Sequence, residues 1–332
     1  MTHSAFDVVG LGNAIVDVIS EADDAFLESW GIHKNAMNLI EEDRADALTD
    51  ASKNAIETSG GSGANTIAGI ASLGGRGAYI GKVADDRLGD VFRKDLQSAG
   101  IAFNTSPLMA GPATARSIIF VTNDGQRSMN TFLGASVEFS PADVDPEIVK
   151  SGNILYLEGY LFDKAPAMAA FVHAAEIAHA AGRKVSLTLS DGFCVDRHRD
   201  SFRQLIQNQV DVLFANEEEL LSLYETRDFN TAIDLLRADT GLAAVTRSEK
   251  GSVVIGDGDP IAVPAEAVVD VIDTTGAGDQ YAAGFLLGVA RDLPLATCAH
   301  LGHIAAAEVI SHFGPRPETE LKSLASQAGI EL

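Results

Sequence analysis

The alternation of short apolar runs with alanine-rich segments constrains the fold of this 332-residue chain more than any other feature. Runs typical of buried strands recur along the chain, and segments whose apolar residues have helical spacing separate them. The clearest runs lie at 7–11, 77–81, 154–157, 184–189, 211–215 and 242–246. Strands that alternate with helices form mostly parallel sheets covered by helices on both faces. The sequence therefore predicts a doubly wound α/β fold.

Two regions interrupt this alternation, at 13–41 and at 107–133. They contain short strand-like pieces at 15–19, 36–40, 117–122 and 127–132, with a turn signal in Thr122-Asn-Asp-Gly. We interpret them as a small antiparallel β-sheet that projects from the core as a lid over the substrate. The predicted domains are therefore a core of residues 1–12, 42–106 and 134–332 and a lid of residues 13–41 and 107–133. From Gly276 onward the pattern predicts helices only.

Charge and cysteine content exclude several classes of function. The formal net charge is −23, which argues against an extended contact with nucleic acid or an anionic membrane surface. Cys194 and Cys298 form no CxxC pair, so neither a disulfide framework nor a thiolate metal site is indicated. No signal peptide or apolar span is recognised. We expect a cytoplasmic protein, monomeric or homodimeric, whose partner is a small molecule.

The run 273–279, Asp-Thr-Thr-Gly-Ala-Gly-Asp, carries the strongest chemical signal. A strand-like run at 268–272 is expected to enter a glycine turn, from which a helix leaves. Unpaired amides at a helix start favour a phosphoryl group. Asp279 falls in the first turn, where a carboxylate accepts the proton of an attacking hydroxyl. The motif alone is equally compatible with an ordinary aspartate at a helix start.

Two further groups of residues suit sugar hydroxyls. Gly60, Gly61 and Gly63 leave backbone amides open before a predicted helix, and Asn65 adds a side chain that both donates and accepts hydrogen bonds. Asn13 and Asp17, four residues apart in a predicted strand, share one face of it. Taken alone, the glycines are also explained by close packing, and Asn13 and Asp17 by solvation on an exposed strand.

Two motifs are set aside. The run 9–15, Val-Gly-Leu-Gly-Asn-Ala-Ile, begins like a dinucleotide fingerprint, but Ile15 occupies the third glycine position and a strand-like run follows. Gly81-Lys82-Val83 resembles the end of a P-loop, but Arg76 replaces the leading glycine and Val83 the Ser or Thr that would hold magnesium.

The two glycine motifs, about 210 residues apart, resemble the paired signatures of the ribokinase-like (PfkB) carbohydrate kinases. Residues 216–219, Asn-Glu-Glu-Glu, resemble the NxxE element of that family, and residues 246–251 resemble its TxGxxG nucleotide loop. Within the family the likeness is strongest to adenosine kinases, through residues 12–17, 154–162, 211–219 and 302–307. The resemblance covers nearly the whole chain and implies use of ATP and Mg²⁺. Some relatives also use a monovalent cation such as K⁺ near the position of Asp273, which no spacing here supports.

The resemblance also implies roles for individual residues. Asp279 would be the base, Gly276, Ala277 and Gly278 the anion hole, and Arg127 would reach the phosphates when the lid closes. Sugar-binding positions would be Asn13, Asp17, Gly60, Gly61, Ser62 and Asn65, and the base pocket would be lined by Ser117, Leu133 and Ala135. ATP would contact Asn216, Thr246, Gly251 and His303. Glu219 would hold Mg²⁺ through water.

The sequence departs from the family pattern at three positions. Ser248 replaces a glycine of the ATP loop, Tyr281 replaces a phenylalanine after the base, and Met37 stands where animal adenosine kinases have a glutamine near the purine. We therefore expect an ATP-dependent adenosine kinase. A kinase of a free sugar such as ribose, fructose or 2-keto-3-deoxygluconate is the alternative, and a catalytically silent binding module or an NAD oxidoreductase are more distant ones.

Overall fold

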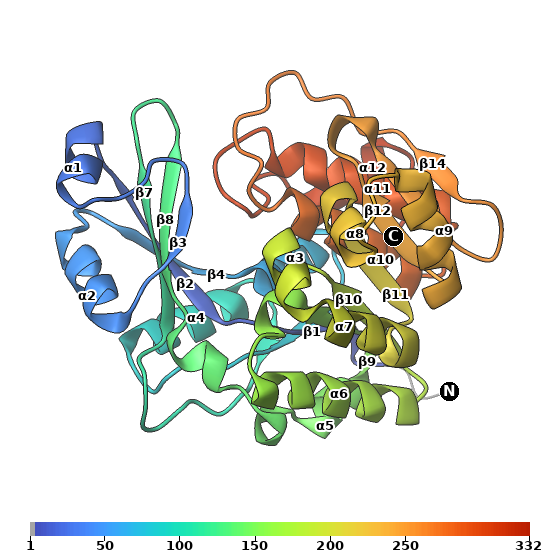
Figure 1. The fold of residues 1–332 in the computed structure, drawn as a ribbon, viewed down its shortest axis with the longest axis horizontal. Helices are drawn as coiled ribbons and strands as arrows, with labels where there is room; N and C mark the ends of the chain where they lie inside the picture. Colours follow the sequence, from blue (N-terminus) through green and yellow to red (C-terminus); the bar gives the residue numbers. More distant parts are fainter. Residues whose placement is uncertain (1–3) are drawn as a thin grey trace.

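A nine-stranded sheet runs through the larger part of the computed structural model, which describes residues 4–332 (Figure 1). Its order is β14 (Ile261–Val263), β13 (Ser252–Ile255), β12 (Ala243–Thr246), β11 (Val212–Asn216), β10 (Lys184–Thr188), β9 (Gly152–Glu158), β1 (Phe6–Leu11), β5 (Gly77–Ile80) and β6 (Ala102–Phe103). All strands from β12 to β6 are parallel, whereas β13 pairs antiparallel with both of its neighbours, β12 and β14. The strands predicted at 7–11, 77–81, 154–157, 184–189, 211–215 and 242–246 are all present, and the predicted α/β fold is confirmed.

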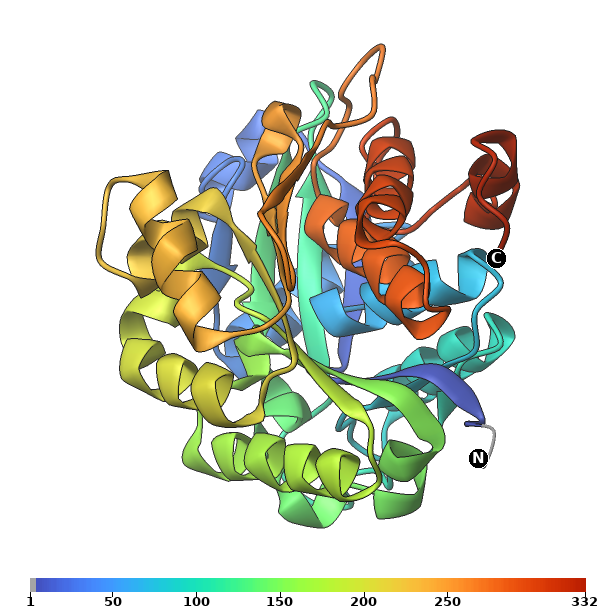
Figure 2. The ribbon, with the colours of Figure 1, turned by 90° about the vertical axis from the view of Figure 1, so that its right-hand side faces the viewer.

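Helices cover both faces of this sheet (Figure 2). One face carries α3 (Ser62–Ser72), α4 (Arg87–Ser98), α10 (Ala277–Ala290), α11 (Leu295–Val309) and α12 (Leu321–Gln327). The other carries α5 (Pro146–Ser151), α6 (Ala165–Ala180), α7 (Gly192–Gln209), α8 (Glu217–Leu223) and α9 (Phe229–Asp239). Short 3-10 helices lie at Gly134–Glu138, Pro141–Asp143, Gly159–Leu161 and Ser248–Lys250.

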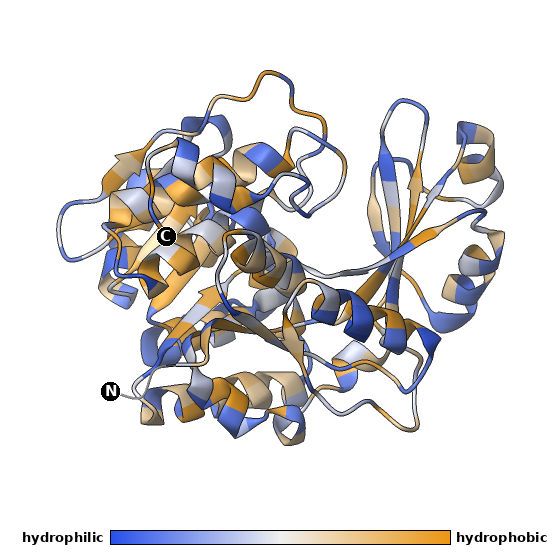
Figure 3. Cartoon of the chain, turned by 180° about the vertical axis from the view of Figure 1, so that it is seen from behind, coloured by the Kyte–Doolittle hydropathy of each residue, from blue (hydrophilic) through white to orange (hydrophobic). Residues whose placement is uncertain are grey.

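The period of the strands divides the apolar side chains between two cores. Val8 and Ile154 point to the core under α3 and α10, whereas their neighbours Val9 and Leu155 point to the core under α6 and α7. Apolar ribbon therefore runs through the middle of the larger part and polar ribbon lies outside (Figure 3). Among residues 4–332, no helix has the length and apolar character needed to cross a bilayer.

A second sheet stands beside the first and consists of five strands (Figure 1). Its order is β3 (Met37–Leu39), β8 (Arg127–Phe132), β7 (Ala115–Val121), β2 (Ile15–Glu21) and β4 (Ile56–Gly60). Helices α1 (Asp24–Ser29) and α2 (Glu42–Ala51) pack on one face of it through Leu27, Leu48 and Phe120. The predicted small sheet is therefore present.

Two details of the prediction for this sheet differ from the structure. The sheet is mixed and not antiparallel, because β2 pairs with β7 and β3 with β8 in parallel. Strand β4 lies within 42–106, a range that the sequence assigned to the core, since local sequence does not reveal the partner of a strand. The division of the chain into two domains remains a prediction.

The strand predicted at 268–272 is wrong. This segment is irregular, and Val269 and Val271 are 98% and 58% exposed. The sheet already ends at β14, so these β-branched residues have no strand to pair with. The amide of Ile272 instead donates to the carbonyl of Ile310, at 2.8 Å.

The contact between α10 and α11 gives a first prediction. A methyl group at Gly284 would lie 2.5 Å from the carbonyl oxygen of Leu301, so we expect Gly284→Ala to push the helices apart. Overpacking of this kind should lower the free energy of unfolding by about 1–3 kcal/mol in urea titrations. Gly241→Ala is the matched control, because nothing lies within 4 Å of the added atom. Equal stability of the two variants would contradict the prediction.

Candidate active site

The polar residues of the two glycine motifs converge at the carboxyl ends of the central strands. Strand β1 lies between β5 and β9. The order of the strands therefore reverses at β1, because β5 and β6 lie on one side of it and the strands from β9 onward lie on the other. Asn13 follows β1 and donates through Nδ2 to Oε1 of Glu158, the last residue of β9, at 2.9 Å. Ligands of open α/β sheets bind at such a reversal, outside the carboxyl ends of the strands.

Asp279 lies in the first turn of α10, as predicted. Ser62 donates through Oγ to its Oδ1 at 2.6 Å, and Asn65 donates through Nδ2 to its Oδ2 at 3.2 Å. The residue keeps a partly exposed face, but its carboxylate lies deep among protein atoms, and this burial raises its pKa from 3.8 to about 6. A carboxylate with such a pKa is a competent proton acceptor near neutral pH.

The turn before α10 has the open amides expected of an anion site. Gly276 adopts φ 82°, and an added Cβ would lie 2.6 Å from Cα of Pro315, so both the conformation and the packing require glycine. The amide of Ala277 donates to the carbonyl of Thr274 at 3.2 Å. Within residues 4–332 the amides of Gly276 and Gly278 have no acceptor, and nothing lies within 4 Å of the position of a Cβ at Gly278.

Asn13 and Asp17 are 2% and 7% exposed, which excludes the alternative of solvated strand residues. The glycine pair makes room for them: a Cβ at Gly60 would lie 2.4 Å from Oδ2 of Asp17, and one at Gly61 would lie 2.7 Å from the carbonyl oxygen of Asn13. Burial raises the pKa of Asp17 to about 6, and the charges of Arg127 and Arg316 oppose that shift. These glycines therefore serve close packing as well as an open loop.

Of the predicted base-pocket residues, Ser117 lies on the face of the second sheet that α1 and α2 leave uncovered, and Leu133 and Ala135 lie just after β8. Strand register places Leu39, Thr131, Ser117, Asp17 and Thr58 side by side in one row. Ser117 and Thr131 share a hydrogen bond of 2.9 Å between their hydroxyl groups. Leu133 and Ala135 follow β8, and the carbonyl oxygen of Leu133 accepts from Ser136, whose Oγ also donates to Oδ1 of Asn13 at 2.9 Å.

Arg127 does not face the open amides but pairs with Asp273. Its Nη1 lies 2.8 Å from Oδ2 of Asp273, and the two side chains are 8% and 10% exposed. The same carboxylate accepts from the amides of Thr275 and Gly314. This ion pair joins β8 of the small sheet to the turn that precedes α10.

The predicted nucleotide residues lie farther along the same edge of the sheet. Asn216 and Thr246 are register partners at the ends of β11 and β12. His303 is buried beside Ser252, with 2.9 Å between Nε2 and Oγ, and does not reach the surface of the site. Gly251 is buried with φ 85°, and Ser248, which replaces a glycine of the family pattern, adopts φ 51° in the region that favours glycine.

Glu219 and Asn216 form a capping box at the start of α8. The amide of Glu219 donates to Oδ1 of Asn216, and the amide and Nδ2 of Asn216 donate back to the carboxylate at 3.0 and 2.6 Å. Burial, together with the charges of Asp191 and Glu218, raises the pKa of Glu219 to about 7. Among residues 4–332 no cluster of three acidic, histidine or cysteine side chains is placed to hold a metal ion.

Sequence reasoning missed two charged residues of this site, Glu158 and Arg316. Glu158 is 1% exposed, accepts from Asn13 and from the amide of Gly63, and has a pKa that burial raises to about 7. Arg316 contacts Ser59, Asn65 and Asp95. Glu158 lies within 154–162, a stretch that contributed only to the family likeness, and Arg316 belongs to no motif, so only the fold reveals that both lie at the site.

The raised pKa of Glu158 predicts a pH-dependent stability. The carboxyl group of Glu158 has a higher pKa in the folded chain than in the unfolded chain. The free energy of unfolding of the protein therefore falls as pH rises from 4.5 to about 7, where the unfolded chain releases this proton more readily. We expect Glu158→Gln to remove that fall, so that its stability relative to the wild type increases by about 3 kcal/mol between pH 4.5 and pH 8. Urea titrations across this range measure the difference. Glu147→Gln, at a side chain 81% exposed, is the control, and parallel curves for Glu158→Gln and the wild type would contradict the prediction.

Comparison with known proteins identifies the family of the chain. The pfkB family carbohydrate kinase model matches residues 24–321. An adenosine kinase from Sinorhizobium meliloti is 53% identical, with 97% of this chain and 99% of that chain covered and a TM-score of 0.89. A probable sugar kinase protein from Rhizobium etli is 50% identical, with 98% and 99% covered and a TM-score of 0.90. A probable fructokinase from Arabidopsis thaliana is 26% identical, covering 71% of this chain and 74% of its own. The chain belongs to the pfkB family of carbohydrate kinases and is a phosphotransferase that acts on a hydroxyl group of a sugar or nucleoside.

Proposed function

We propose that this kinase transfers the γ-phosphoryl group of ATP to the 5′-hydroxyl of adenosine, giving AMP and ADP. The observation that carries the proposal is the face of the small sheet that α1 and α2 leave uncovered. Leu39 shares a row with Ser117 and Asp17, and Met37 lies two residues along the same strand, so 60% and 51% exposed apolar side chains adjoin sugar-binding polar ones. A nucleoside has this chemistry, with an apolar base beside a hydroxylated ribose, whereas a free sugar is polar throughout.

Aromatic side chains on the core support the same proposal. Tyr160 follows β9 and is 38% exposed, and Phe193 at the start of α7 is 77% exposed. Exposed aromatic rings of this size are suited to stacking on a base. The similar protein from Sinorhizobium meliloti is named an adenosine kinase, which agrees with this substrate.

In the proposed reaction Asp279 accepts the proton of the 5′-hydroxyl as that oxygen attacks the γ-phosphorus in line. The amides of Gly276 and Gly278 donate to the oxygens of the migrating group, where negative charge gathers. Asn13 and Asp17 orient the ribose from the side of the lid. Arg127, when released from Asp273, contacts the phosphates, and the closed lid excludes water.

On the nucleotide side we propose contacts of ATP with Asn216, Thr246 and Gly251, whereas His303 is buried against Ser252 and is not proposed as a contact. Glu219 would hold Mg²⁺, which the family implies, through water, and the ion would neutralise charge on the transferring phosphates. The acidic surroundings of Glu219 fit a cation held mainly by phosphate oxygens and water, since magnesium in such kinases takes only one or two carboxylates. Both carboxylate oxygens of Asp273 have partners from Thr275, Arg127 and Gly314, so the proposal includes no monovalent cation there.

The acceptor specificity tests the proposal directly. We expect coupled ADP release to give a higher kcat/KM for adenosine than for inosine, ribose, fructose or 2-keto-3-deoxygluconate, with AMP as the product. Asp279→Asn, assayed in parallel, controls for contaminating kinases. A free sugar that exceeds adenosine would favour the alternative, a sugar kinase of the same family, which the names of the fructokinase relatives support.

Substitution of the proposed base should separate activity from stability. We expect Asp279→Asn to lower kcat by roughly 10²–10⁴-fold while ATP still binds. Because the pKa of Asp279 is raised, its ionisation lowers the stability of the folded chain as pH rises from about 4 to 6, and the variant should gain about 3 kcal/mol of stability at pH 8 but little at pH 4. Turnover assays and urea titrations measure both effects. Asp270→Asn, at an exposed aspartate before the motif, is the control. Near-wild-type turnover of Asp279→Asn would contradict the assignment.

A further inference from the structure

Arg316 lies outside the proposed reaction but reaches one of its residues. From the segment after α11, its Nε donates to Oδ1 of Asn65 at 3.2 Å, its Nη2 to Oγ of Ser59 at 2.8 Å, and its Nη1 to Oδ2 of Asp95 at 3.0 Å. Only 21% of its side chain is exposed. Three fixed partners around one planar guanidinium define both its place and its orientation.

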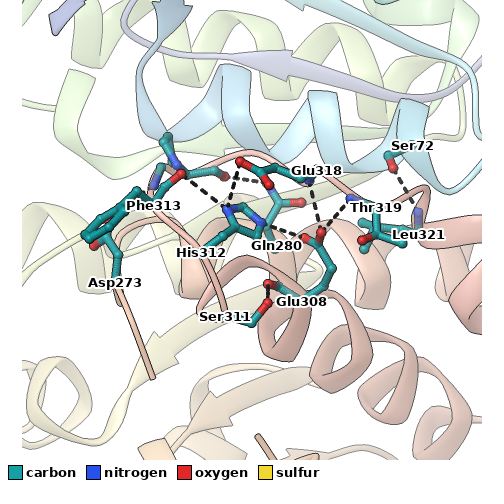
Figure 4. A network of polar contacts seen from close by, with 12 residues as sticks. Ser72, Asp273, Gln280, Glu308, Ser311, His312, Phe313, Glu318, Thr319 and Leu321 are labelled. Carbon is teal, nitrogen blue, oxygen red and sulfur yellow. Dashed lines mark hydrogen bonds and ion pairs between the residues drawn. The ribbon is translucent and has the colours of Figure 1, made fainter. Parts of the chain in front are cut away.

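The backbone that carries Arg316 is fixed on both sides. Glu308 of α11 accepts from the amides of Glu318 and Thr319 and pairs with Nε2 of His312 at 3.2 Å (Figure 4). In the same segment, the amide of Gly314 donates to Asp273. The buried carboxylate of Glu308 therefore holds the loop both before and after Arg316, which fixes the backbone position of Arg316.

The segment also meets the proposed anion site. Pro315 packs against Gly276, and its carbonyl oxygen accepts from Nε2 of Gln280 at 2.9 Å (Figure 4 labels Gln280 beside this loop). The same Nε2 donates to the carbonyl oxygen of Asn65 at 3.1 Å. A displacement of this segment would therefore alter the packing at the glycine turn before α10 and the hydrogen bond to Asn65 of α3.

The carboxamide of Asn65 has two unlike ends, and each meets the group that suits it. Its oxygen accepts from the guanidinium of Arg316, and its amino group donates to the carboxylate of Asp279. The reversed orientation would set the amino group against a cation and the oxygen against a carboxylate, which is unfavourable at both ends. We infer that Arg316 is a positioning residue, whose guanidinium fixes the carboxamide of Asn65 so that its amino group faces the proposed base. This inference rests on the proposed function.

Loss of Arg316 therefore has a defined consequence for Asp279. Without the guanidinium, the carboxamide is free to turn, and the carboxylate loses a donor that stabilises its ionised form, so its pKa rises. The other titratable and charged groups that lie near Asp279 or near Arg316 come from several elements. They are Asp17 of β2, Tyr79 of β5, Asp95 of α4, and Tyr156, Glu158 and Tyr160 at the end of β9. Arg316→Met leaves all of these groups in place.

The test compares Arg316→Met and Arg316→Lys with the wild type in profiles of kcat against pH. We expect Arg316→Met to lower kcat by roughly 10²-fold and to move the acid limb upward by about one pH unit, with the KM for ATP unchanged. Arg316→Lys keeps the positive charge but not the planar guanidinium, so we expect it to recover part of the lost kcat and to reduce the shift of the acid limb. The double variant with Asn65→Ala should be no slower than Asn65→Ala alone. Arg199→Met, at an arginine 26% exposed on α7, is the matched control with an unshifted profile.

A second readout does not require turnover. In protein labelled with ¹³C at aspartate carboxyls, the signal absent from Asp279→Asn reports the titration of Asp279, and its midpoint should rise by about one pH unit in Arg316→Met and less in Arg316→Lys. An unchanged midpoint, an unshifted acid limb or additive losses in the double variant would each overturn the inference. If the wild type phosphorylates none of the acceptors tested, the proposed function fails, whereas the titration still decides the role of Arg316.

Discussion

The carboxylate of Asp279 is buried at the start of α10, and its burial makes the ionised form of this group unfavourable. The neighbouring polar side chains of the site are placed where they reduce this cost. Hydrogen bonds from Ser62 and Asn65 offset part of that cost, but the pKa of Asp279 still rises to about 6. Glu158 lies near it as a second buried carboxylate whose pKa is raised. Groups that lower stability at neutral pH are retained where chemistry requires them.

Hydrogen bonds and ion pairs bring distant parts of the chain together at the site. The bond between Ser62 and Asp279 spans 217 residues, and that between Ser59 and Arg316 spans 257. The pair between Arg127 and Asp273 adds the small sheet to this assembly. In the proposed reaction, closure over a substrate would exchange that pair for contacts with phosphate, which would couple the position of the small sheet to the occupancy of the proposed anion site.

Local sequence pattern predicted the strands that are continuously apolar and failed where the presence of a partner decides whether a strand forms. The strands at 154–157 and 184–189 form a central part of the sheet, and the glycine turn before Asp279 has the predicted shape. The run at 268–272 has strand composition but no neighbour to pair with. Glu158 lies in a stretch that contributed only to the family likeness, and Arg316 lies outside every motif, so only tertiary folding reveals that they lie beside Asn13 and Asn65.

A structure of the complex with adenosine and a non-hydrolysable ATP analogue tests the central claim most directly. The distance from the 5′-oxygen of the nucleoside to the carboxylate of Asp279 is the quantity that matters. We predict about 2.6–3.2 Å, with the γ-phosphate analogue facing the amides of Gly276 and Gly278. A 5′-oxygen that lies nearer to Glu158 or Asp17 than to Asp279 would contradict the assignment of the base.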